Sequence, residues 1–163
     1  MGLGKTIQVI ILIYLHIKYS LLQKKKTLVL CPSSLINNWI EEFKILKYIN
    51  ESNHFTIITT NVNYKSVLST QCIICSFTIF QNNFFLLYFM PYRLLILDEA
   101  QFIKNIRTNL HRSLLKIKVT SKFLLTGTPI ENKMKDLFTL YNFIIPGFLN
   151  NFFNNTLSWI DIR

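Results

Sequence analysis

Short, uninterrupted apolar runs recur along this chain and alternate with segments of helical periodicity. The runs cover residues 27–31, 55–60, 72–76, 93–97 and 122–126. Strands that are apolar at nearly every position are buried on both faces, which is typical of a parallel sheet covered by helices on both sides. The pattern therefore predicts an α/β fold around a parallel sheet of about five strands.

Three segments beside these runs have the spacing of amphipathic helices: residues 35–46, residues 110–117, and a segment that opens at Asn132 and ends before Pro146. The first and third have apolar stripes made of Leu35, Trp39, Phe43 and Leu46, and of Leu137, Leu140, Tyr141 and Ile144. In such folds ligands bind beyond the carboxyl ends of the strands. The polar residues that follow each strand are therefore the candidates for function.

The first six residues carry a glycine-rich pattern ahead of an apolar helical segment. Gly2, Gly4, Lys5 and Thr6 match the second half of a phosphate-binding P-loop. Glycine lets backbone amides approach a phosphate closely, and a helix N-terminus favours the anion. In such loops the lysine neutralises phosphate charge and the threonine hydroxyl holds magnesium. The pattern predicts a site for ATP and Mg²⁺.

Other interpretations use the same residues. The full P-loop pattern has one more glycine and a preceding strand, which would both lie before residue 1, so we expect the first strand of the sheet to be missing. A chance glycine-rich start stays open, as does a complete small P-loop NTPase. Met1-Gly2 with Thr6 also fits the N-myristoylation pattern, in which Gly2 would carry a lipid.

Two carboxylates follow the apolar run at residues 94–97. Asp98 and Glu99 at the tip of a buried strand form a Walker B arrangement. In that arrangement Asp98 would hold Mg²⁺ and Glu99 would act as the general base on the attacking water. A similar pattern follows the run at residues 122–126, where Thr126, Gly127 and Thr128 place two hydroxyls that could bond to the carboxylates. The alternative there is an ordinary turn.

These motifs together resemble the Swi/Snf-type ATPases of helicase superfamily two. The matching blocks are GLGKT at 2–6, LVLCPSSLINNWIEEF at 28–43, LLILDEAQFIKN at 94–105, and LLTGTPIENKMKDLFTLYNFIIPGFL at 124–149. Their order and spacing also match motifs I, Ia, II and III of that family. The glutamine at Gln101 looks like the bacterial branch more than the chromatin remodellers.

The resemblance implies a RecA-like fold, ATP and Mg²⁺ as ligands, and duplex DNA as a sequence-independent partner. It implies that Gln101, Thr126, Gly127 and Thr128 couple nucleotide state to movement. It also implies that the following residues contact the DNA backbone, where small hydroxyls and amides suit phosphates: Pro32, Ser33, Ser34 and Ser76.

The resemblance is partial, because the family's adenine-recognising motif and second RecA-like lobe have no counterpart in this sequence. We expect a partial ATP-binding lobe over residues 1–149, followed by an Asn-rich tail over 150–163. The second lobe normally supplies arginines that complete hydrolysis, so we expect little turnover unless a neighbouring reading frame provides it. The alternative is a non-catalytic, DNA- or partner-binding remnant.

The formal net charge is +10, from 18 basic and 8 acidic side chains. Such a charge suits a polyanionic partner such as DNA, although an AT-rich genome would also enrich lysine. No membrane segment is expected, because Pro91 and Arg93 interrupt the apolar stretch at 84–97. We expect a cytoplasmic protein if the source is bacterial and a nuclear one if it is eukaryotic.

Three cysteines fit a reducing compartment better than a disulfide scaffold. Cys72 and Cys75 form a C-x-x-C pattern that could read as half a zinc site or a redox pair. Residues three apart on a strand point to opposite faces, and no second pair completes a metal site. We therefore interpret Cys31, Cys72 and Cys75 as structural.

Overall fold

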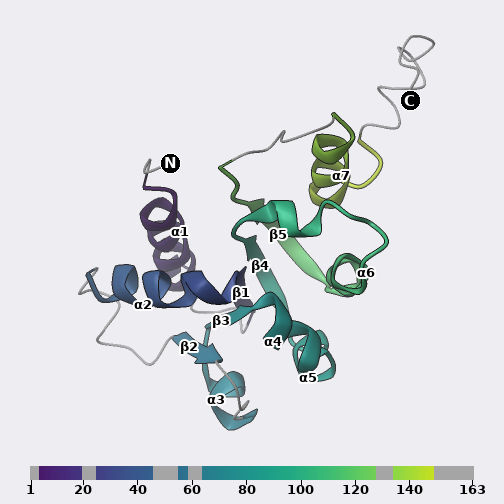
Figure 1. Ribbon diagram of the computed structural model, residues 1–163. Helices are drawn as coiled ribbons and strands as arrows, with labels where there is room; N and C mark the ends of the chain where they lie inside the picture. Colours follow the sequence, from purple (N-terminus) through teal and green to yellow (C-terminus); the bar gives the residue numbers. More distant parts are fainter. Residues whose placement is uncertain (1–3, 20–24, 46–54, 59–63, 128–133, 149–163) are drawn as a thin grey trace, which may run out of the picture.

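Five strands form one parallel sheet in the computed structural model, which describes residues 4–19, 25–45, 55–58, 64–127 and 134–148. The strands are β1 (Lys26–Cys31), β2 (Phe55–Ile58), β3 (Cys72–Ser76), β4 (Tyr92–Leu97) and β5 (Val119–Leu124), in the spatial order β2-β3-β1-β4-β5 (Figure 1). All four neighbouring pairs are parallel. The predicted α/β fold is confirmed.

Side chains alternate between the two faces of the sheet, as they must on extended strands. In β1, Leu28 and Leu30 belong to one buried cluster, and Val29 and Cys31 belong to the other. All six residues of β1 and all five of β3 are buried, which is why the sequence has apolar runs there instead of alternation. The sheet is thus the shared wall of two cores.

Helices cover both faces (Figure 1). One face is packed by α1 (Lys5–Tyr19) and α2 (Ile36–Ile45), and a single 3-10 turn, η1 (Ser33–Leu35), leads into α2. The other face is packed by α3 (Tyr64–Ser69), α4 (Phe77–Asn82), α5 (Phe84–Tyr88), the 3-10 turn η3 (Ala100–Ile103), α6 (Asn109–Lys116) and α7 (Met134–Ile144). Helices on both faces were predicted from the buried strands, and this is confirmed.

The three cysteines are free and buried in the sheet. Cys72 faces the α1–α2 core and Cys75 faces the opposite one, as expected for positions three apart on a strand. Burial raises the pKa of Cys72 to about 12, and it raises the pKa of Cys75 further. A thiol held in this state is a packing group and a poor nucleophile.

Two predictions about elements were wrong in detail. β5 begins at Val119 and ends at Leu124, whereas the apolar run predicted 122–126. Thr120 and Ser121, near the start of β5, are polar and exposed, so the apolar run begins later than the strand does. On α7, Tyr141 is exposed, and Phe143 packs into the core in its place. Lys122 of β5 lies over the Phe143 ring and donates a hydrogen bond to the Phe143 carbonyl.

The short helices α3, α4 and α5 were not predicted. They carry buried residues all the same: Phe80 and Leu87 are fully buried. Helices this short give too few turns for a periodic pattern. Within the described residues no helix combines the length and apolar character needed to cross a membrane.

Candidate functional site

A cavity of about 290 Å³ lies where β4 ends, beside the start of α1 and one side of α2. We call the edge at which the strands end the carboxyl edge, and the edge at which they begin the amino edge. The residues lining the cavity come from three separate parts of the sequence: Lys5, Thr6, Leu35, Asn38, Trp39, Glu42, Asp98 and Glu99. The structure therefore brings the predicted P-loop residues and the predicted Walker B pair to one hollow.

The start of α1 is shaped by Gly4. Its φ is +65°, in the left-handed region that glycine adopts without a steric penalty, and its carbonyl accepts the first α1 hydrogen bond from the Gln8 amide at 3.1 Å. Lys5 and Thr6 follow in the first helical turn, where unpaired backbone amides and the helix dipole favour an anion. This turn contains no acidic residue that would compete for that position.

Asp98 extends β4 by one hydrogen bond, from its amide to the Leu30 carbonyl at 2.8 Å. Its side chain is 7% exposed, and both oxygens are occupied. The Trp39 indole Nε1 donates to Oδ2 at 3.0 Å, and the Glu99 amide donates to Oδ1 at 3.0 Å. The carboxylate is therefore fixed in orientation from two sides while each oxygen keeps a further lone pair.

Burial raises the pKa of the Asp98 carboxyl above its ordinary value. The hydrogen bonds from Trp39 and from the Glu99 amide oppose this rise, the charge of Glu99 adds to it, and the charge of Lys5 opposes it. Among these influences burial is the largest. A cation placed at this position would therefore relieve the cost of keeping the carboxylate ionised.

Glu99 has a left-handed backbone, with φ 51° and ψ 56°. Residues other than glycine rarely adopt this region, and they do so most often at functional sites. Its Oε2 accepts a hydrogen bond from Gln101 Nε2 at 2.7 Å, and Gln101 Oε1 accepts one from the Thr126 hydroxyl at 3.1 Å. Gln101 therefore bridges Glu99 and Thr126, one of the two hydroxyl residues that the sequence analysis placed near the carboxylates.

Three cavity residues on α2 escaped the sequence analysis as site residues. Trp39 was assigned to an apolar face, which is correct for its ring but overlooks its N–H bond to Asp98. Asn38 and Glu42 are one helical turn apart and line the same hollow. Oε2 of Glu42 is buried and has no hydrogen-bond partner among the described residues. Burial, and then the charge of Asp98, raises the pKa of Glu42.

Comparison with known proteins matches residues 1–162 to the SNF2-related domain. The chain belongs to the SNF2-related family. It is 35% identical over 157 residues to an uncharacterized ATP-dependent helicase of Mycoplasma genitalium. That alignment covers 93% of this chain and 15% of the helicase. It is also 35% identical over 164 residues to the chromatin-remodeling ATPase INO80 of Vanderwaltozyma polyspora, in an alignment that covers 93% of this chain and 10% of INO80.

The fold agrees with this assignment. The Sulfolobus solfataricus SWI2/SNF2 ATPase core in complex with dsDNA superposes with a TM-score of 0.76 and 29% sequence identity, over 90% of this chain and 30% of that chain. The described residues thus form a RecA-like lobe of SNF2 type. The chain spans only a small part of the length of these relatives.

The remaining predicted site residues of this SNF2-related lobe lie around the same edge. Pro32 follows the last residue of β1, and Ser33 and Ser34 open η1 with exposed side chains. Ser76, at the end of β3, is 4% exposed, and its hydroxyl accepts from the Ile79 amide at 3.2 Å as the N-cap of α4. The predicted contact of Ser76 with DNA stays a prediction. Gly127 is exposed.

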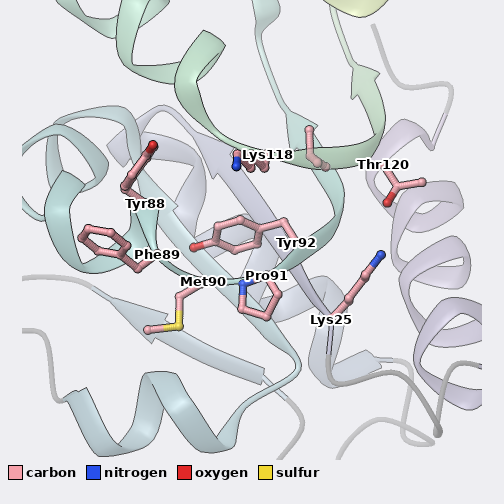
Figure 2. A pocket seen from close by; sticks show the side chains of 9 residues that line it. Lys25, Tyr88, Phe89, Met90, Pro91, Tyr92, Lys118 and Thr120 are labelled. Carbon is pink, nitrogen blue, oxygen red and sulfur yellow. The ribbon is translucent and has the colours of Figure 1, made fainter.

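Two predicted residues, Gly2 and Thr128, lie outside the described residues. A larger hollow, of about 580 Å³, lies at the amino edge of the described residues (Figure 2). It contains none of the predicted site residues. Because chemistry needs convergent polar groups more than volume, the carboxyl-edge cavity is the candidate nucleotide site.

Proposed function

We propose that this chain is the nucleotide-binding lobe of a DNA-dependent ATPase of the SNF2 type. The observation that carries the proposal is the meeting of Lys5, Thr6, Asp98 and Glu99 around one cavity at the carboxyl edge. The two groups, Lys5 with Thr6 and Asp98 with Glu99, lie at least 92 positions apart in the sequence, and the parallel sheet brings them together. The set is the one that phosphoryl transfer requires.

The phosphates of ATP would lie at the start of α1. There the Lys5 ammonium neutralises the outer phosphates, while backbone amides of the first turn donate to the phosphate oxygens. Gly4 adopts the left-handed conformation that such a loop needs, and as a glycine it places no side chain beside the phosphates.

The donor set fits Mg²⁺, which prefers oxygen ligands and keeps several waters. Thr6 and Asp98 would hold the ion, and both line the cavity. The buried Asp98 carboxylate, oriented by Trp39, matches a group whose charge needs a nearby cation. When bound, the ion would neutralise charge that develops on the transferring phosphate.

Glu99 would accept the proton of the attacking water. Its strained backbone directs the carboxylate away from the strand, and Gln101 Nε2 fixes one of its oxygens. The hydrogen bond from Thr126 to Gln101 connects Glu99, through Gln101, to the segment that follows β5. A change in the Glu99 environment during hydrolysis would therefore be transmitted to the segment after β5, which is the coupling role that we propose for these three residues.

Duplex DNA is the proposed partner of the exposed turn at Pro32, Ser33 and Ser34. The net charge of +10 supports it, and the archaeal structural relative was solved with dsDNA. Contacts of this kind bind phosphates and do not read sequence. We therefore expect the affinity to fall steeply with salt, because bound counterions are released when DNA is neutralised.

Complete hydrolysis would also need charge from outside this lobe. Arginines supplied by a neighbouring domain are worth roughly 10³–10⁵ in rate in related NTPases. We propose that a second lobe supplies them and that this chain alone binds nucleotide but turns it over at less than about 1 s⁻¹.

Calorimetric titration of the chain with ATP and MgCl₂ tests the proposal. We expect measurable binding that EDTA reduces and that Lys5→Ala abolishes. Glu99→Gln should bind like the wild type, because it keeps the side-chain shape and loses only the base. Binding that is unchanged in Lys5→Ala would refute the proposed nucleotide site.

A further inference from the structure

The hollow of about 580 Å³ at the amino edge has a composition unlike that of the nucleotide cavity. It lies between the end of α5 and the points at which β4 and β5 begin (Figure 2). Its volume is in the range of sites that take small ligands or an anchoring side chain. Its lining is mostly apolar, and it includes two lysines and no carboxylate: Lys25, Tyr88, Phe89, Met90, Pro91, Tyr92, Lys118, Val119 and Thr120.

One aromatic residue of this hollow, Phe89, is 73% exposed, which is unusual for a side chain of its size. Phe85, one helical turn earlier and outside the lining, is 81% exposed. Exposed apolar side chains that lie near one another mark a site of interaction. Aromatic residues are also those that most often supply binding energy in protein interfaces.

These exposed rings stand on a packed base. Phe80 contacts Phe84 at 5.8 Å between ring centroids, Phe84 contacts Tyr88 at 5.4 Å, and Tyr88 contacts Phe89 at 5.0 Å. Phe80 is fully buried, so this series of rings connects the exposed Phe89 to the core. An aromatic group that is already fixed loses little freedom on binding.

Among the described residues that line the hollow, the charged ones are both lysines. Lys118 lies above Tyr92 in the view of Figure 2, and Lys25 lies on the other side of it from Phe89. Both lysines are exposed. An occupant would therefore need an apolar centre and acidic flanks.

We propose that this hollow docks an acidic, amphipathic segment of a partner protein. The segment places an apolar side chain against Phe89 and Met90 and sets carboxylates beside Lys25 and Lys118. A second copy of this chain is disfavoured, because each copy carries a net charge of +10. Single-stranded nucleic acid is disfavoured too, because it needs a row of cations that follows its backbone, and two lysines around one hollow do not form one.

Fluorescence anisotropy of the full chain with labelled peptides tests this proposal. The probe has a central Leu-Trp-Leu group between runs of glutamate; one comparison peptide has lysine for glutamate, and another has serine for the apolar group. We expect the acidic amphipathic peptide alone to bind. Phe89→Ser should weaken it about tenfold or more, and Lys118→Glu should weaken it and reduce its salt dependence.

Matched controls are Phe148→Ser and Lys65→Glu, which change exposed residues that do not line the hollow. We expect both to bind like the wild type, and all four variants to keep the wild-type melting temperature and ATP affinity. Equal binding of the lysine peptide, or absence of binding, would overturn the proposal. So would displacement of the peptide by a single-stranded oligonucleotide, or self-association of the chain that Phe89→Ser abolishes.

Discussion

The two edges of the sheet are built from the same strands but carry cavities of different chemistry. β4 begins at Tyr92 in an apolar hollow flanked by lysines and ends at Leu97, next to a buried and hydrogen-bonded carboxylate. At the carboxyl edge, loops that follow the strands bring polar groups from distant parts of the sequence into one site. At the amino edge the cavity is twice as large, yet it holds no convergent polar set.

The comparison shows that volume and chemistry are independent in this lobe. The small cavity is lined by Trp39, which orients Asp98, and by Glu99, whose carboxylate accepts a hydrogen bond from Gln101 behind it, so these side chains are fixed before any ligand binds. Such pre-organisation is what catalysis needs. The large cavity has a fixed aromatic wall and exposed lysines, which suits recognition of a flexible segment.

The largest expected effect is a loss of stability when a core side chain of the shared sheet is truncated. Leu95 lies in the middle of β4 and is fully buried, so Leu95→Ala should lower the free energy of unfolding by about 2–5 kcal/mol. Leu115→Ala, on the exposed side of α6, should change it by less than about 0.5 kcal/mol. Urea denaturation measures both, and similar losses in the two variants would contradict the assignment of the core.

A smaller effect should separate the two edges. Trp39→Phe keeps the ring in the core but leaves Asp98 without its indole donor, at a cost to stability of about 1–3 kcal/mol. Because Asp98 then loses its fixed orientation, we expect weaker binding of ATP with Mg²⁺ as well. Peptide binding at the amino edge should not change. Loss of both activities in a folded Trp39→Phe chain would mean that the edges are not independent.

The glutamine bridge should be visible as a non-additive effect. Gln101→Ala and Thr126→Val each remove the Gln101–Thr126 bond, so the loss in the double variant should be smaller than the sum of the two single losses. We expect a coupling energy of about 0.5–1 kcal/mol in a double-mutant cycle of denaturation measurements. Strictly additive losses would show that the bond contributes nothing.

The smallest expected effect is the labelling of the three cysteines in the sheet. Burial raises the pKa of Cys31 and of Cys72 to about 12, so at neutral pH almost no thiolate is present at either residue. We expect a maleimide to label none of the three cysteines in the native chain and all of them in urea, as followed by mass spectrometry. Rapid native labelling of Cys72 and Cys75 would revive the redox interpretation of the C-x-x-C pattern.

Much of the carboxyl edge could be predicted from sequence, and little of the amino edge could. Apolar runs identified β1, β3 and β4 within one residue, because buried strands must be apolar on both faces. The rule that ligands bind beyond strand ends then directed attention to Asp98 and Glu99. Short motifs carry these residues, so their chemistry is visible without a structure.

The remainder depends on contacts between segments far apart in the chain. The Trp39–Asp98 bond joins residues 59 positions apart, and nothing in the local pattern of α2 distinguishes a tryptophan that only packs from one that also donates. The amino-edge hollow draws on three unconnected segments that share no motif. The start of β5 was missed because partly exposed strand residues need not be apolar.

The most direct test of the account is to find which edge of the sheet nucleotide protects. Hydrogen–deuterium exchange of the chain with and without ATP and Mg²⁺ should show slower exchange at residues 4–8, 36–42 and 98–101, which surround the carboxyl-edge cavity. Residues 88–92 and 118–120 at the amino edge should be unaffected. Protection confined to the amino edge, or equal protection in the Lys5→Ala chain, would contradict the assignment of the nucleotide site.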